Sequence, residues 1–498
     1  METHLPILLI AVPLVAAPLM VLIGNRTLVM ILSIAVAWSV FAIAVGLMGQ
    51  VLEPGNGVIE YALGDWPSPY GIVYRIDSFN AFVMLFVSAL GAIVLTYAPV
   101  SIDQQIPRSK HYLFYTSYLL CLTGLLGMCV TGDLFNVFVF LEISSLSSYA
   151  LISLGKNRRA PLAAFQYLIL GTIGATFFLL GIGLLYQITG TLNMADIADR
   201  LAIANTPRAQ LVAFAFMTVG LCIKMAVFPL HTWLPNAYTY APSVVTSFIA
   251  ATATKVSVYA FARLVFTIYT PKFAFETLPL GEVLTVFALV GIFVASGAAI
   301  YQYNVKRLLA YSSVAQIGYM LLGISLATEL GLSAGIVHMF NHALIKGGLF
   351  MVVGCFALRI GSVRIGDLCG AAKTMPWTSF AWVVGGLGLI GVPLTAGFVS
   401  KWMLLKATME QGRWPVAVLM LISSLLAVVY VWKVVEALYF SEPSEKAKHA
   451  KEAPALMLVP TYLVIGLTIL FGCWSVFSAG LANEAAKALL MTSMGGAP

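Results

Sequence analysis

Runs of about 20 apolar residues recur along almost the whole of this 498-residue chain, and each is long enough to cross the hydrocarbon core of a membrane as a helix. Because lipid offers no hydrogen bonds to the backbone, such segments must be helical where they span. The sequence therefore predicts an all-α integral membrane protein with about 14 transmembrane helices. The fourteen runs cover residues 5–23, 28–48, 79–98, 111–131, 133–155, 161–187, 208–228, 242–269, 281–303, 308–328, 331–358, 377–409, 414–440 and 455–479.

The composition excludes a soluble or disordered protein. Charged residues make up 9% of the chain and hydrophobic residues 60%, whereas soluble chains carry about 25% charged residues. The net charge of +7 does not predict nucleic-acid binding, because the Lys and Arg residues are dispersed along the chain. The six cysteines have no paired spacing, which argues against a disulfide framework or a metal cluster, and we expect no cofactor.

Polar segments between the runs are few and short. Residues 49–78 are rich in Gly and Pro and predict a folded, turn-rich loop. Residues 191–204 have apolar positions at helical spacing and predict a short surface helix, and residues 480–498 are a second candidate of that kind. The first apolar run is followed by many others, so we interpret it as a span rather than a cleaved signal peptide.

The distribution of Lys and Arg predicts the orientation. Of the 27 cations, the odd-numbered loops hold 14, while the even-numbered loops and the termini hold 6. Because cytoplasmic loops carry the excess of Lys and Arg, we expect a multi-pass protein of a bacterial inner (cytoplasmic) membrane with both termini outside. The other cations lie within helices: Lys224, Lys255, Arg263, Lys346, Lys401, Lys406 and Lys433.

A charged side chain at the centre of a spanning helix costs about 2.5–3.5 kcal/mol, so such residues indicate a function or a partner. Arg263, Lys406 and Lys433 lie toward helix ends, where we expect them to extend to the interface. The remaining titratable groups predict a row near the middle of the bilayer. Its members are Glu142, Lys224, Lys255, His338, His342, Lys346 and Lys401, of which the three on helix 11 follow at i, i+4 and i+8 on one stripe.

The residue types of this row favour proton transfer. Lys, His and Glu can be tuned by their surroundings to exchange a proton near neutral pH, whereas Arg stays charged, and the row contains no Arg. A static ion pair between Glu142 and Lys224 is the structural alternative. Two histidines at i and i+4 can also bind zinc, but HMFNH (338–342) lacks the Glu and the third ligand of a metalloprotease, so we expect no metal site.

Two proline-containing segments predict broken helices. FPLHTWLP contains Pro229 and GVPLTAGF contains Pro393, 164 residues further on. Interrupted helices at matching positions of two halves are typical of inverted repeats in transporters. We therefore predict two inverted five-helix repeats with broken helices 7 and 12. The expected units are residues 1–110 (helices 1–3 with an outer loop), 111–270 (helices 4–8), 271–440 (helices 9–13) and 441–498 (helix 14 and a C-terminal tail).

Together these motifs resemble the antiporter-like subunits of respiratory complex I, membrane-bound hydrogenases and Mrp-type multisubunit cation/proton antiporters. The segments that carry the resemblance are GDLFNVFVFLEISSLSSYALI (132–152), KMAVFPLHTWLPNAYTYAP (224–242), HMFNHALIKGG (338–348) and GVPLTAGFVSKW (391–402). The resemblance implies a proton relay. Glu142 and Lys224 match the coupling pair of this relay, and Lys255 matches its bridging group. His338 and His342 match its central positions, and Lys346 follows them. Lys401 matches its terminal group.

Length and the segment 132–152 resemble the D-type subunit of Mrp antiporters most. The resemblance implies a subunit of a secondary transporter rather than an enzyme. The transporter would exchange Na⁺ or K⁺ for protons. The partners of the subunit would be other antiporter subunits in a hetero-oligomeric complex, together with membrane lipid. Two alternatives stay open: a proton-pumping subunit in a redox-driven complex I-type or hydrogenase membrane arm, and a scaffold that only binds its neighbours.

Overall fold

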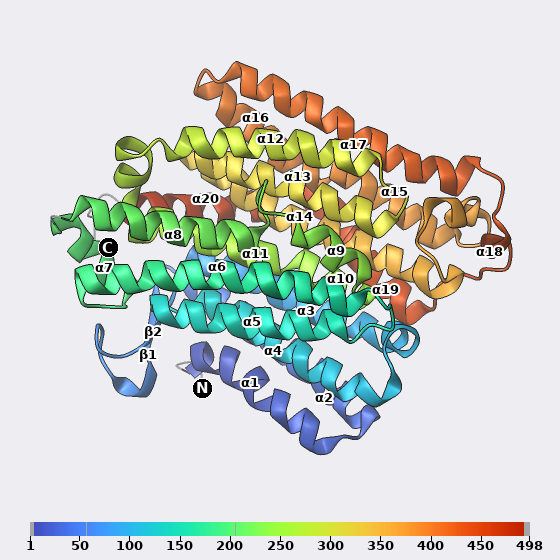
Figure 1. Cartoon of the computed structure of the whole chain (residues 1–498), viewed down its shortest axis with the longest axis horizontal. Coiled ribbons are helices and arrows are strands. Elements are labelled where there is room, and N and C mark those ends of the chain that lie inside the picture. The colour runs from blue at the N-terminus through green and yellow to red at the C-terminus, as the bar shows by residue number, and fades with distance from the viewer. Residues whose placement is uncertain (1–3, 56, 205, 493–498) are drawn as a thin grey trace.

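The chain forms a bundle of long, roughly parallel helices, with one small β-hairpin at its edge (Figure 1). This computed structural model describes residues 4–55, 57–204 and 206–492. Within them, 13 helical segments are long and apolar enough to cross a membrane. The predicted twelfth span is divided into two helices of 15 residues each, which are too short to count alone. The expected all-α membrane fold with 13 to 14 spans is therefore confirmed.

The first eleven α-helices are α1 (Leu5–Ile23), α2 (Arg26–Leu52), α3 (Ser78–Gln105), α4 (His111–Val130), α5 (Leu134–Ser153), α6 (Ala160–Thr189), α7 (Met194–Ile203), α8 (Pro207–Met225), α9 (Trp233–Tyr240), α10 (Ser243–Ala251) and α11 (Ala253–Arg263). The first six α-helices and α8 follow predicted runs, whereas the predicted run 242–269 is divided between α10, α11 and the segment after them. The chain then continues through two π-helical segments, η4 (Leu264–Ile268) and η5 (Lys272–Thr277).

The remaining helices complete the bundle. They are α12 (Leu280–Ile300), α13 (Val305–Ser325), α14 (Glu329–Ile360), α15 (Pro376–Ile390), α16 (Ala396–Glu410), α17 (Trp414–Phe440), α18 (Glu445–Lys448), α19 (Ala455–Cys473) and α20 (Val476–Thr492). Short 3₁₀ turns lie at Leu63–Asp65, Arg108–Lys110, Ile365–Leu368 and Ala371–Lys373. The division of the chain into two five-helix repeats stays a prediction.

The turn-rich segment 49–78 folds as expected, around two short strands. In its hairpin β1 (Ile59–Ala62) pairs antiparallel with β2 (Val73–Ile76), and Ile59 lies opposite Ile76. The hairpin leads directly into α3, whose N-terminus is closed by a capping box: Asp77 accepts from the main-chain N–H of Asn80, and the Asn80 side chain accepts from the N–H of Asp77.

The two predicted surface helices have different outcomes. α7 is a short amphipathic helix, as expected, with Ile197 as its buried residue. α20 begins at Val476 and packs one face against α14 and α3, so it is an integral part of the bundle rather than a surface segment. Its buried face consists of Leu481, Ala482, Ala485, Ala486 and Leu489. Residues 493–498, the last part of the predicted helix 480–498, lie outside the described residues.

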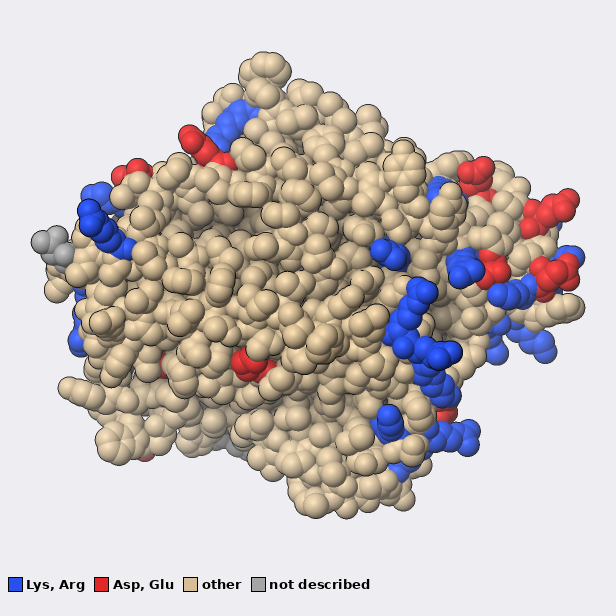
Figure 2. All heavy atoms as spheres, viewed as in Figure 1, with Lys and Arg blue, Asp and Glu red and all other residues tan. Residues whose placement is uncertain are grey.

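The interior of the bundle is formed by a few central helices. The spans Ser243–Ile268 (α10, α11 and η4) and Val305–Ser325 (α13) are 94% buried, whereas α2 is 28% buried. Outer helices turn apolar side chains to lipid, as the composition requires, and Figure 2 shows that the middle of one face carries few charged side chains. Residues on α11, α13 and α14 are thus shielded from lipid by other helices.

Both predicted helix breaks are present. Between α8 and α9 the chain leaves the helix at Ala226, which has φ 60°, and passes Pro229. Between α15 and α16 it leaves at Gly391, with φ 89°, and passes Pro393. An interior proline removes a backbone hydrogen bond, and polar side chains replace such bonds here: the indole of Trp233 donates to the Ile223 carbonyl at 2.9 Å.

A third break was not predicted. α10 ends at Ala251 and α11 begins at Ala253, because Thr252 has non-helical angles of φ −121° and ψ −58°. No proline lies at this point, so the sequence carries no local signal for it. The break frees the carbonyl of Ala250, which accepts a hydrogen bond from the Lys255 ammonium.

Close packing at the α15–α16 break gives a stability prediction. A Cβ on Gly397 would lie 1.9 Å from the Gly388 carbonyl oxygen. We expect Gly397→Ala to lower the free energy of unfolding by about 1–3 kcal/mol, because the two halves of the broken helix must separate. Thermal unfolding in detergent measures this loss.

Gly466→Ala is the matched control, because the Cβ at this helical position on α19 meets nothing within 4 Å. We expect that variant to be as stable as the parent or slightly more stable, since alanine favours helix over glycine. Equal melting temperatures for Gly397→Ala and the parent would contradict the close contact.

Candidate functional site

Glu142 on α5 and Lys224 on α8 meet between their helices. The Lys224 Nζ lies 3.6 Å from the Glu142 Oε1, and it donates to the Ser145 hydroxyl at 2.7 Å and more weakly to Tyr149 at 3.5 Å. Lys224 is 5% exposed, whereas the Glu142 side chain is 23% exposed. Glu142 Oε1 has no hydrogen-bond partner among the described residues. The pair is therefore an ion pair without a fixed hydrogen bond, which leaves the carboxylate free to move.

Lys255 on α11 is fully buried at the α10–α11 break. Its ammonium donates to the Ala250 carbonyl and to the Thr254 hydroxyl, the latter at 3.3 Å. Within the described chain no carboxylate forms an ion pair with it. Lys255 therefore differs from Lys224: its partners are neutral groups, one of them created by the helix break.

The two histidines on α14 are stacked, with ring centroids 6.2 Å apart and planes 9° from parallel. His338 hydrogen-bonds Ser400 and Gln316, each at 2.9 Å. Both ring nitrogens of the buried His342 are without a partner in the part of the chain that the structure describes. Buried polar atoms are normally satisfied by protein or by ordered water, so His342 is a position where we expect water to bind.

Lys346 and Lys401 complete the row. Lys346, on α14, donates to the Leu309 carbonyl at 2.9 Å and to the Ser312 hydroxyl. Lys401, on α16, donates to the carbonyls of Leu389 and Ile390 at 3.3 and 2.8 Å, both of which are freed by the α15–α16 break. Its Nζ also lies 5.0 Å from the centre of the Tyr319 ring. Neutral acceptors thus bind both lysines.

Three of the four row lysines lie at helix breaks. Lys224 is the residue before the last of α8, Lys255 follows the α10–α11 break, and Lys401 follows the α15–α16 break. Backbone released from helical hydrogen bonding is tolerated at membrane depth where it lines a polar interior. The breaks therefore supply acceptors for ammonium groups inside the bundle.

The structure brings the row together in two groups. In the second, Lys255 binds the end of α10, which packs against α14 with His338, His342 and Lys346. Lys401 lies beside Tyr319, whose ring centroid is 5.5 Å from that of His338. The first group is Glu142 with Lys224. No hydrogen bond or ion pair between described residues joins the two groups directly.

Aromatic residues that were not predicted lie beside these groups. The ring of Tyr149, which Lys224 contacts, is 4.6 Å from that of Tyr167, and Tyr167 stacks on Trp233 at 3.8 Å. Tyr238, on α9, donates to the Ile249 carbonyl at 3.4 Å. Tyr149 and Tyr238 lie within the two segments quoted for the family resemblance, so their hydroxyls were visible in the sequence, but their positions depended on the fold.

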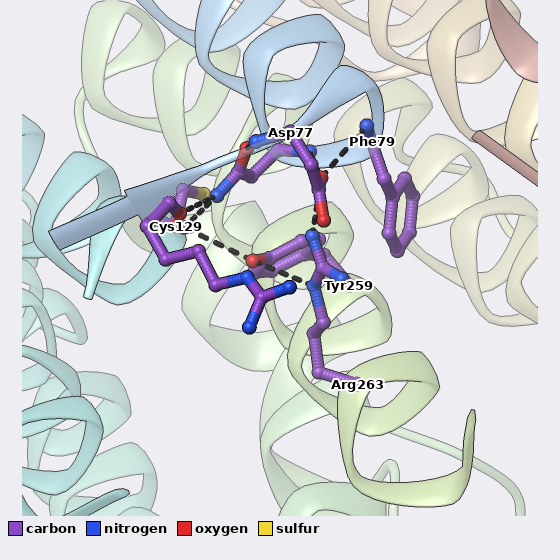
Figure 3. A network of polar contacts seen from close by, with 7 residues as sticks. Asp77, Phe79, Cys129, Tyr259 and Arg263 are labelled. Atoms are coloured by element: carbon purple, nitrogen blue, oxygen red, sulfur yellow. Dashed lines mark hydrogen bonds and ion pairs between the residues drawn. The ribbon is translucent and has the colours of Figure 1, made fainter. Parts of the chain in front are cut away.

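Arg263, at the end of α11, binds protein groups instead of projecting into solvent. Its side chain is 13% exposed, and its guanidinium forms an ion pair with Asp77 at 2.5 Å and donates to the Tyr259 hydroxyl at 3.0 Å (Figure 3). The Tyr259 hydroxyl in turn donates to the Cys129 carbonyl at 3.0 Å. This network ties α11 to the start of α3 and to the end of α4. It makes no contact with the lysine row, and we interpret it as structural.

The other two cations that were expected near helix ends, Lys406 and Lys433, have different partners. Lys406 is exposed and pairs with Glu410 one turn away. Lys433 donates to the carbonyls of Ile300 and Gln302, each at 3.1 Å, at the end of α12 and in the loop that follows it.

The Asp77–Arg263 pair gives a pH prediction. Burial on its own raises the pKa of the Asp77 carboxyl, but the charge and hydrogen bond of Arg263 hold that pKa below its ordinary value. The pair's stabilisation is therefore complete above about pH 3.9, the unfolded pKa, and is lost as the pH falls through the lower folded pKa. We expect Asp77→Asn to remove this part of the acid dependence of thermal unfolding.

Removal of the cation tests the same pair at neutral pH. Arg263→Met leaves the Asp77 carboxylate, which is only 14% exposed, without its cation, so we expect it to cost up to about 3–5 kcal/mol of unfolding free energy. Arg200→Met is the control, since Arg200 pairs with Asp196 on the exposed α7 and such a pair is worth about 0–1 kcal/mol. Equal losses in the two variants would contradict the buried pair.

Lys306 is a buried lysine that lies just before the predicted run 308–328 and was therefore counted among the loop cations. It is the second residue of α13, is 5% exposed, and donates to the Ala241 carbonyl at 2.8 Å. Its position before the apolar run made it look like a loop residue, and only the packing of α13 against the end of α9 buries it.

Comparison with known proteins places this geometry among membrane subunits of two kinds of complex. The family described as "NADH:quinone oxidoreductase/Mrp antiporter, TM" matches residues 131–427. The N-type subunit of the NADH-quinone oxidoreductase of Desulforudis audaxviator is 41% identical over 502 residues, covering 97% of each chain. The D-type subunit of the Na⁺/H⁺ antiporter of Alkalihalophilus pseudofirmus is 29% identical over 471 residues, covering 94% of each.

A solved structure agrees over the whole length. A chain of the membrane-bound sulfane sulfur reductase, an archaeal respiratory membrane complex, superposes with a TM-score of 0.90 at 32% identity, covering 99% of each chain. The expected resemblance is therefore confirmed at the level of the shared family. The finer resemblance to the D-type Mrp protein is weaker than that to the quinone oxidoreductase protein, at 29% against 41% identity.

Proposed function

Because this chain belongs to the NADH:quinone oxidoreductase/Mrp antiporter transmembrane family, we propose that it translocates protons as an antiporter-like subunit of a redox-driven respiratory membrane complex. The 41% identity to a quinone oxidoreductase subunit and the 32% identity to a chain of a sulfur-reducing respiratory complex support the redox-driven assembly over the antiporter assembly. The chain itself holds the proton path, and partner subunits carry out the redox reaction.

One observation carries the proposal: a row of buried lysines and histidines in which only Lys224 has a carboxylate partner among the described residues. An ammonium held by carbonyl and hydroxyl oxygens can lose its proton without leaving a buried carboxylate uncompensated. The row therefore suits reversible protonation.

The Glu142–Lys224 pair provides the coupling. At 3.6 Å the two charges attract strongly in a low-dielectric interior, so approach of Glu142 favours the charged form of Lys224 and withdrawal favours release of its proton. The partly exposed side of Glu142 and its unpaired Oε1 allow this movement. A released proton would pass the Tyr149–Tyr167 region on water toward Lys255.

The second half of the path continues from Lys255 to His342 and Lys346, and from there through His338 to Lys401. Imidazole can accept a proton on one nitrogen and donate one from the other, which suits the stacked pair in the middle of the row. With both termini outside a bacterial inner membrane, as the loop cations predict, Lys401 would exchange its proton with the outside. Membrane lipid surrounds the outer helices.

A second candidate, a component of an Mrp-type Na⁺ or K⁺/proton antiporter, is favoured by the match to the D-type antiporter protein over 94% of both chains. Copurification from the native membrane followed by mass spectrometry of the partners separates the two. We expect quinone- or sulfur-reducing subunits with iron–sulfur centres. Recovery of small antiporter subunits alone would favour the antiporter instead.

A third possibility, a scaffold that only binds its neighbours, is tested with the purified complex in proteoliposomes. We expect substrate-driven acidification of the lumen or medium that depends on the row. Intact translocation after replacement of the row residues by Leu or Met would establish the scaffold and exclude the relay.

A further inference from the structure

A cavity of about 380 Å³ opens at the end of the bundle where five connections meet. It lies between the C-terminal ends of α3, α9 and α14, the first residues of α10 and α13, and the α5–α6 connection. All of these connections are odd-numbered loops, and the cation-rich set of loops predicts this end to face the cytoplasm. The row of relay residues does not line the cavity.

The lining of the cavity is positively charged. Lys306 and Lys156 both line it, with the side-chain amides of Gln104 and Asn157. The Lys306 ammonium donates to the Ala241 carbonyl at 2.8 Å, and the Lys156 ammonium donates to the Gln104 carbonyl at 2.9 Å. Among the described residues neither lysine forms an ion pair, and no Asp or Glu lines the cavity.

A helix terminus adds to this positive potential. α10 begins at Ser243 on the cavity wall, and Gln105 binds both the N–H and the hydroxyl of Ser243, at 2.5 and 3.1 Å. The partial positive charge of the first turn of a helix favours an anion nearby. On the rim, Arg159 donates to the hydroxyl of Tyr240, another lining residue, at 3.0 Å.

We propose that this cavity binds a phosphate-bearing anion, such as the headgroup of an anionic phospholipid. An anion in the cavity would give Lys306, which is 5% exposed and has no carboxylate partner among the described residues, a charged partner that favours its ammonium form. Basic pockets between membrane helices on the cytoplasmic side bind anionic headgroups. One water molecule needs about 10–15 Å³ of such a cavity. A cavity of about 380 Å³ therefore has room for a headgroup. The bound anion joins elements from both predicted repeats.

The proposal does not depend on proton transfer through the row, and its test has a readout other than translocation. The full-length chain is reconstituted in nanodiscs of phosphatidylcholine with or without phosphatidylglycerol or cardiolipin. Retained lipids are then counted by native mass spectrometry. We expect one anionic lipid to stay bound after delipidation of the parent protein.

Two variants and one control make the test specific. Lys306→Met removes the buried charge, and Asn157→Glu adds a carboxylate at an exposed lining position without touching the core. We expect both to retain the anionic lipid about five- to tenfold less well. Lys110→Met removes an exposed cation that does not line the cavity, so its retention should equal that of the parent.

A second arm separates lipid from free phosphate. Inorganic phosphate is added to the delipidated protein at constant ionic strength, with chloride as the comparison, and thermal unfolding is recorded. A phosphate-specific rise in melting temperature without lipid retention would assign the site to free phosphate, and its loss in Asn157→Glu would support the same chemistry. If neither ligand binds, or if both cavity variants behave like Lys110→Met, the proposal is wrong.

Discussion

Lys224→Met is expected to lower proton translocation by about a hundredfold, because a positioned proton donor and acceptor contributes about that much or more. The variant keeps the length and much of the volume of the side chain but removes the proton-carrying group from the Glu142 pair. Reconstituted complex in proteoliposomes, with a pH-sensitive dye and the redox substrate of the complex, measures the rate. Assembly is checked in the same preparation by size-exclusion chromatography.

Lys406→Met is the matched control for this loss. Lys406 is also a lysine within a membrane-spanning segment near a glutamate, Glu410, but its side chain is 63% exposed and lies outside the row. We expect parental translocation from the control. A Lys224→Met complex that translocates at the parental rate would show that the Glu142–Lys224 pair only holds α5 to α8.

Lys401→Arg is expected to abolish translocation while the protein stays as stable as the parent. Arginine keeps the positive charge and can still donate to the Leu389 and Ile390 carbonyls at the α15–α16 break, but it does not release its proton at physiological pH. Lys401→Leu is expected to lose translocation and also about 1–3 kcal/mol of stability, because it leaves these buried carbonyls without a donor. Thermal unfolding and the proteoliposome assay together distinguish the two losses.

Lys433→Arg provides the control with matching chemistry. Lys433 also donates to two main-chain carbonyls, those of Ile300 and Gln302, yet it is not part of the row. We expect this variant to translocate and unfold like the parent. If Lys401→Arg translocates protons at the parental rate, Lys401 only binds the carbonyls at the helix break. The relay would then need a different terminal group.

The order of the membrane spans could be predicted from sequence because each span is a local property. A run of about 20 apolar residues must bury its own backbone hydrogen bonds in lipid, whatever its neighbours do. The breaks near Pro229 and Pro393 were also predictable, since proline removes a helical hydrogen bond within its own turn. Proline alone is not decisive, however: Pro99 and Pro460 lie inside continuous helices.

The surroundings of the charged residues were less predictable. Lys224 was expected to meet Glu142, and it does. Arg263, however, pairs with Asp77 with only 13% of its side chain exposed, and Lys306 is buried. Asp77 lies 186 positions before its partner Arg263. A side chain's partner depends on which helices pack together, and no local pattern contains that information.

The amino-acid sequence by itself determined that this chain spans the membrane many times, that two helices are broken at prolines, and that Lys, His and Glu lie within the spans. Only the tertiary structure decided the break at Thr252, the division of the row into two groups, and the cavity around Lys306. The physical reason is how far along the chain each interaction acts. Hydrophobic burial and backbone hydrogen bonding act within one segment, whereas the partners of a buried charge come from whichever segments close packing brings beside it.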